Sequence, residues 1–137
     1  MDPKYAVLIQ CQIAKNRCSG FACTNAFYNR DEMFKDYPPS TKYIAFTCGG
    51  CCGKGTAAKL EHFTKKLAKA EGLSKNEIVV HLASCMVTDN HHYDRCPHVE
   101  YIKKIIGKHG YNNIVEKTYI SKNAHKRRCE GQYNTYE

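Results

Sequence analysis

The stretch Tyr43-Ile-Ala-Phe-Thr-Cys-Gly-Gly-Cys-Cys-Gly53 decides the fold, because an apolar run passes there into a loop of thiols and glycines. The run 43–47 has the length and composition of a strand. After the loop, residues 56–71 repeat apolar side chains at the spacing of an amphipathic helix, and Gly72 follows as its cap. The segment therefore predicts a strand, a cysteine loop and a helix in succession.

Strands and helices alternate on both sides of this unit. Apolar runs at 5–10, 78–84 and 113–120 predict three more strands, and the segments 20–29 and 97–109 predict helices between strands. Such alternation forms a parallel sheet through right-handed crossovers. We therefore expect an α/β fold: a small doubly wound, flavodoxin-like sheet of about four parallel strands, in the order 2-1-3-4, with helices on both faces.

The length of 137 residues suits one domain with its own core. We expect this domain to occupy residues 1–120, followed by a polar C-terminal tail over 121–137. The start Met1-Asp-Pro-Lys4 lacks the pattern of a secretory signal, and the apolar runs are too short to span a bilayer. These features favour a cytoplasmic protein with no membrane partner.

The formal net charge is +8, but the Lys and Arg residues are spread over two predicted helices and the tail. A nucleic-acid site would gather cations on one face, interleaved with aromatic residues. Dispersed charge is typical of a solvated surface. We therefore do not expect nucleic acid as a partner, and the sequence names no protein partner.

Eight of the nine cysteines fall at one edge of the predicted sheet. Cys11, Cys48 and Cys85 each follow a strand, and the carboxyl ends of parallel strands form the edge where open α/β sheets place their sites. The loops after these strands carry the other five thiols: Cys18, Cys23, Cys51, Cys52 and Cys96. In a reducing compartment, such a thiol count indicates metal, cluster or redox chemistry rather than disulfides.

Cys48 and Cys51 form a Cys-x-x-Cys pair, whose sulfurs can ligate one metal ion or cycle as a disulfide. Arg17, Lys54 and Arg95 flank the cysteine loops, so we expect lowered thiol pKa values. Lowered pKa values suit metal ligation and thiol exchange equally. The residues alone therefore leave both chemistries open, and whether the protein is an enzyme is not decided.

His98 is the histidine that best fits a site, because it follows Cys96 in the first turn of a predicted helix. It is a candidate ligand or, in a catalytic site, the proton carrier for a Cys51 nucleophile. His81 lies within a predicted strand and is expected to be a satisfied interior residue. Two histidines fall in a polar loop where side chains are usually solvated, His91 and His92.

The glycines at the start of the helix after the cysteine loop suggest a phosphate cradle as a minor alternative. Gly53 and Gly55 open this helix directly after a strand. The Walker pattern fails, however, since Cys48 stands where its first glycine belongs.

The cysteine motifs follow one another in a characteristic order. They are Gln10-Cys11, Cys18-Ser-Gly20 with Cys23, Cys48-Gly-Gly-Cys51, Leu82-Ala-Ser-Cys85 and Cys96-Pro-His98. This series resembles the CGGC domain family, which is named for its central motif. The resemblance implies a metal-binding role, usually proposed as zinc, because the family pattern is rich in Cys and His. The chain departs from that pattern at Cys52 and Ser19, which replace prolines, and Cys129 lies outside the motifs.

Together, these observations predict a metal-binding protein, with zinc as the expected metal and metal handling or sensing as the role. The first-choice ligands are Cys48, Cys51, Cys85 and Cys96, and the next are Cys11, Cys18, Cys23 and His98. The seven thiols that match the family exceed the four ligands of one structural zinc ion. This surplus keeps open an iron–sulfur cluster protein and a thiol/disulfide oxidoreductase that uses Cys48 and Cys51.

Overall fold

A sheet of four parallel strands forms the centre of the computed structural model, which describes residues 2–50, 53–90 and 94–135. The strands are β1 (Tyr5–Gln10), β2 (Lys42–Thr47), β3 (Ile78–Leu82) and β4 (Ile114–Glu116). They stand in the order β2-β1-β3-β4, and every neighbouring pair is parallel. The predicted α/β class and strand order are confirmed.

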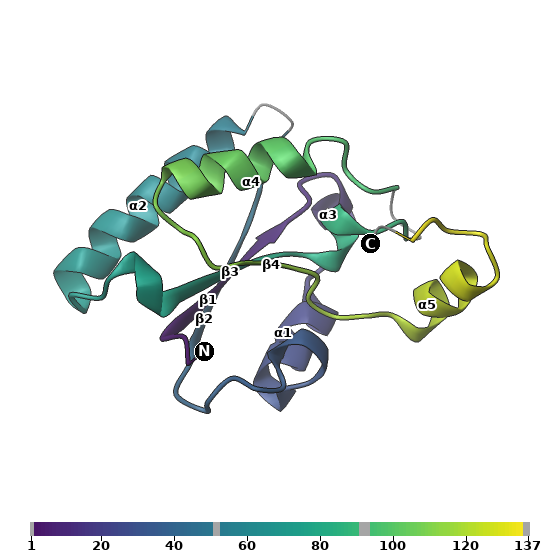
Figure 1. Ribbon diagram of the computed structural model, residues 1–137, viewed down its shortest axis with the longest axis horizontal. Coiled ribbons are helices and arrows are strands. Elements are labelled where there is room, and N and C mark those ends of the chain that lie inside the picture. The colour runs from purple at the N-terminus through teal and green to yellow at the C-terminus, as the bar shows by residue number, and fades with distance from the viewer. Residues whose placement is uncertain (1, 51–52, 91–93, 136–137) are drawn as a thin grey trace.

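Helices cover both faces of the sheet (Figure 1). Helices α2 (Lys54–Ala70) and α4 (Val99–Lys108) lie on one face, and α1 (Phe21–Asn29) lies on the other. The short helix α3 (Ser84–Val87) follows β3, and α5 (Lys122–Cys129) follows β4. Three single turns of 3-10 helix complete the elements: η1 (Ala14–Asn16), η2 (Glu32–Phe34) and η3 (Lys75–Glu77).

The central strand β1 supplies side chains to a core on each face. Val7 and Ile9 are fully buried in the core beneath α2 and α4, and Ala6 and Leu8 are fully buried in the core beneath α1. This alternation is the period of a strand whose two faces are both covered. The continuous apolar run in the sequence is therefore explained by burial on both sides.

Three segments differ from the sequence prediction near the carboxyl edge of the sheet. Strand β3 ends at Leu82, before the expected end, and Ser84 begins helix α3. Strand β4 ends at Glu116, although the sequence predicted a strand to residue 120. The segment expected to be a polar tail carries α5, whose N-cap Ser121 accepts a hydrogen bond from the Ala124 backbone at 3.4 Å. No helix in the described part of the chain is long and apolar enough to cross a membrane.

Glycines let the backbone at the end of β2 lie very close to the backbone at the start of α2. Gly49 has a φ of 75°, in the left-handed region that favours glycine. A Cβ on Gly55 would lie 2.6 Å from the Gly49 Cα and 2.9 Å from the Cys48 carbonyl oxygen. The Thr56 hydroxyl donates to the same oxygen at 3.1 Å. Gly49 and Gly55 are therefore needed so that the two backbone segments can pack directly against each other.

We predict that Gly55→Ala destabilises the protein by about 1–3 kcal/mol, because the added methyl group meets backbone atoms that cannot move aside. Gly107→Ala is the control: nothing lies within 4 Å of a Cβ at this position of α4, so alanine should stabilise the fold by about 0.5–1 kcal/mol. Urea unfolding followed by circular dichroism measures both changes. A Gly55→Ala protein as stable as the parent would contradict the close approach.

Candidate functional site

Cysteines stand at the carboxyl ends of three neighbouring strands. Cys11 follows β1, and Cys48 follows β2, where its backbone N–H donates to the Gln10 carbonyl at 2.9 Å. Cys85 lies just beyond β3, in the short helix α3 rather than directly at a strand end. The sheet therefore places all three residues at its carboxyl edge.

Cys85 is the centre of a group of four thiols, which we call the Cys85 cluster: Cys85, Cys11, Cys18 and Cys23. Burial raises the pKa of the Cys85 thiol to about 12, although a hydrogen bond from the Cys11 backbone lowers it. Negative charge on Cys23, Cys11 and Cys18 raises the pKa of Cys85 further. Each of these three thiols therefore lies within electrostatic reach of Cys85.

The expected lowering of thiol pKa values is wrong for Cys85. Burial outweighs the effect of any cation, and the charges that act on Cys85 come from other thiols. One flanking cation is engaged elsewhere, since the Arg95 guanidinium pairs with the Glu116 carboxylate at 2.9 Å and donates to the Val87 carbonyl at 2.7 Å. Cys85 is therefore a neutral thiol at physiological pH.

Hydrogen bonds join the elements that carry these thiols. The Cys23 sulfur of α1 lies 3.2 Å from the hydroxyl oxygen of Thr118, in the segment after β4. The Thr118 backbone N–H donates to the Ser84 hydroxyl at 3.0 Å, and the Ser84 backbone N–H donates to the Thr118 hydroxyl at 3.3 Å. Helix α1, helix α3 and the end of β4 are thus held together beside the Cys85 cluster.

Two other predicted ligands, Cys48 and Cys96, lie on the face of the sheet beneath α2 and α4, where Cys11 also packs. Cys48 is 8% exposed and belongs to the core beneath α2 and α4, and Cys96 packs against the same core. The backbone N–H of His98, the N-cap of α4, donates to the Cys96 sulfur at 3.4 Å. This face therefore brings Cys96 and the His98 backbone together.

The predicted ligand set stays a prediction. Four of the residues named from the sequence fall outside the described residues: Cys51, Cys52, His91 and His92. Within residues 2–50, 53–90 and 94–135, no three Cys, His, Asp or Glu side chains stand close enough to hold one metal ion.

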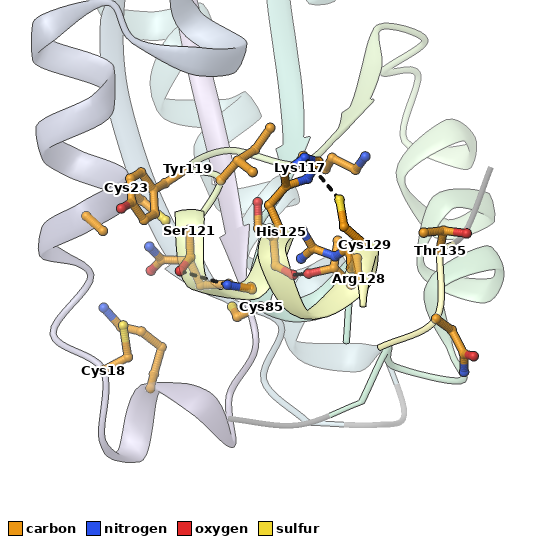
Figure 2. A pocket seen from close by; sticks show the side chains of 18 residues that line it. Cys18, Cys23, Cys85, Lys117, Tyr119, Ser121, His125, Arg128, Cys129 and Thr135 are labelled. Atoms are coloured by element: carbon orange, nitrogen blue, oxygen red, sulfur yellow. Dashed lines mark hydrogen bonds between the residues drawn. The ribbon is translucent and has the colours of Figure 1, made fainter. Parts of the chain in front are cut away.

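A cavity of about 660 Å³ opens beside the Cys85 cluster. Cys18 and Cys23 face it from the α1 side and Cys85 from α3, while α5 contributes His125, Arg128 and Cys129 (Figure 2). Within α5, the Cys129 sulfur lies 3.7 Å from His125 Nε2. The cavity therefore adds a thiol and an imidazole to the edge predicted from the strands.

Sequence reasoning missed the cavity residues of α5 because this helix has no apolar stripe. Its one buried residue is Ala124, and its remaining side chains are mostly charged or polar. The signal that could have found it is Ser121, a good N-cap residue, followed by a run of helix-forming residues.

His81 is fully buried and both of its ring nitrogens have partners. Nδ1 lies 2.9 Å from the Lys117 carbonyl oxygen, so it carries the proton and donates. Nε2 then accepts from the Tyr37 hydroxyl at 2.6 Å. Burial lowers the pKa of His81 and keeps the ring neutral. The prediction of a satisfied interior histidine is confirmed.

Comparison with known protein families finds the CGGC domain over residues 5–119. The chain belongs to the CGGC domain family. The match runs from β1 past β4 and includes every cysteine except Cys129. Metal binding is the role proposed for this family. No curated protein and no solved structure matches the chain.

We predict that Cys85 of the reduced, metal-free protein reacts far more slowly with iodoacetamide than Cys129 does. At pH 8, a thiol with a pKa of about 12 is ionised in only about one molecule in 10⁴, whereas Cys129 is exposed. Peptide mapping by mass spectrometry gives both rates, and the Cys85 rate should climb as the pH rises. In urea the two rates should converge. Equal rates in the folded protein would contradict the environment of Cys85 described above.

Proposed function

We propose that this CGGC domain binds a thiophilic metal ion, with zinc preferred, through cysteines at the carboxyl edge of the sheet, and acts in metal handling or sensing. The observation that carries the proposal is the Cys85 cluster, in which three other thiols lie within electrostatic reach of Cys85. Thiolates are the ligands that zinc and other soft ions prefer.

The chemistry of the donor set fits such an ion, while the described side chains are not arranged as a three-ligand site. Binding therefore requires the thiols to draw together and to release their protons. Cys85 is the costliest thiol to ionise, because burial raises its pKa to about 12. The affinity for metal should accordingly fall as the pH falls.

Cys85 belongs to both ligand sets considered for this edge. One set joins it with Cys48, Cys51 and Cys96, and the other is the Cys85 cluster, with His98 as a further donor for either. The effects of Cys11, Cys18 and Cys23 on Cys85 favour the cluster, because each of these thiols lies within electrostatic reach of Cys85.

We predict that the full chain, purified without oxygen and exposed to zinc, retains about one or two ions per chain after the excess is removed. Cys85→Ser should lose at least half of this metal, because it removes a ligand common to both sets. Cys129→Ser is the matched control, since Cys129 lies outside the family match, and it should retain the metal. Elemental analysis gives the stoichiometry, and competition with a chelator should show weaker binding at pH 6 than at pH 8.

Two further variants separate the ligand sets. Cys18→Ser should lower the affinity if the Cys85 cluster holds the ion, and Cys48→Ser should lower it if the other set does. A wild-type chain that retains no thiophilic metal would contradict the proposal. A purified chain that contains iron and acid-labile sulfide would show an iron–sulfur protein instead of a zinc protein. Reversible formation of a Cys48–Cys51 disulfide in a metal-free chain would favour the oxidoreductase.

A further inference from the structure

The cavity beside the Cys85 cluster carries a charge pattern that metal binding does not explain. Its volume of about 660 Å³ lies within the range of small-molecule sites, about 300–1,000 Å³. Among its described lining residues, three are permanent cations and none is Asp or Glu; the cations are Lys15, Lys117 and Arg128. The cavity wall is therefore positively charged.

These three cations are not neutralised by the described carboxylates. None of the ion pairs in the described part of the chain includes Lys15, Lys117 or Arg128. Lys15 instead donates to the Ser19 carbonyl at 3.0 Å. Two of these cations come from different elements, since Lys15 belongs to η1 and Arg128 to α5, so an anion inside the cavity could be held from both.

Arg128 has hydrogen-bonding capacity to spare. Its Nη2 donates to the Asp89 carbonyl at 3.4 Å, while its Nε is buried and has no acceptor among the described residues. A buried donor without an acceptor is costly. A small rotation of the side chain toward the cavity would let an anionic group accept from the guanidinium.

Much of the remaining wall is apolar or carries aromatic surface. It includes Ala22, Ile120 and Ala124, and Tyr119 lies at the side of the cavity nearest Cys23 (Figure 2). Such a wall suits the hydrocarbon part of a ligand rather than a free inorganic ion. The positive charge and the apolar surface together indicate a ligand with an anionic group on an apolar body.

We propose that this cavity binds a small organic anion, in which a carboxylate, sulfonate or phosphate monoester group on an apolar body is held by Arg128 and Lys15. The proposal does not rest on metal binding, because neither cation needs a metal ion to attract an anion. The thiols of Cys18, Cys23 and Cys85 face the same space as the ligand.

The fluorescent anion 8-anilinonaphthalene-1-sulfonate tests this proposal, with the uncharged N-phenyl-1-naphthylamine as a probe of the same apolar body. The full chain is used free of metal, reduced with dithiothreitol, in a buffer without phosphate, sulfate or EDTA. The sulfonate should bind at one site per chain and about tenfold more tightly than the neutral dye, because charge-assisted hydrogen bonds add to apolar contact.

Arg128→Gln should weaken binding of the sulfonate about tenfold and leave binding of the neutral dye unchanged. Arg127→Gln is the matched control: it removes the same charge from the same helix, but Arg127 is exposed and does not line the cavity. Because Arg128 also bonds the Asp89 carbonyl, Lys15→Gln supplies a second test that leaves α5 untouched, and it too should weaken the sulfonate. Thermal unfolding checks that each variant is folded.

Displacement of the dye by octanoate or by octyl phosphate would support the proposal and identify the preferred anionic group. Four results would overturn it: no binding of the sulfonate, equal affinity for the charged and neutral dyes, equal displacement by octanol, or affinity for the sulfonate that neither Arg128→Gln nor Lys15→Gln lowers more than Arg127→Gln does. Loss of bound zinc in Cys85→Ser, measured separately, bears on the metal site alone.

Discussion

The pairing of β1 with β2 on one side and β3 on the other is the constraint on which the site depends. The strands run in parallel, and Gln10 is paired with Thr47 while Ile9 is paired with Leu82. Because these ends are level, the chain leaves each strand at the same edge of the sheet. Backbone hydrogen bonds between the strands therefore bring Cys11, Cys48 and the helix that carries Cys85 to the same edge of the sheet.

The fold could be predicted because its main signals are local. The apolar runs 5–10 and 43–47 both form strands, the first buried on both faces and the second partly buried, and the helix between β2 and β3 has a clear stripe. The end of β3 could not be read in this way, because Ser84 is held by Thr118, which lies 34 positions away. Helix α5 likewise depends on distant contacts, since the chain just beyond it reaches the Asp89 carboxylate through the Asn134 backbone at 3.0 Å.

The sequence correctly predicted that cysteines lie at the carboxyl edge of the sheet, but it predicted a lowered pKa for Cys85, whereas burial raises this pKa. Neighbours in sequence suggest cations beside cysteines, whereas the pKa depends on burial and on which groups meet in space. A neutral Cys85 also matters for the cavity, because Lys15 and Arg128 then act without an opposing charge from this sulfur. Ionisation of the thiols at a metal would weaken that positive field, so the two proposed chemistries are electrostatically linked.

The cavity has walls of two origins. The thiols of Cys18, Cys23 and Cys85 come from within the family match, which ends at residue 119, whereas Arg128 and Cys129 come from the helix that follows it. The last helix thus contributes Arg128 to the choice of ligand, while Lys15 and these three thiols belong to the family match. During evolution, a change in α5 can alter which ligand the cavity binds, while the strand pairing that positions the thiols stays intact.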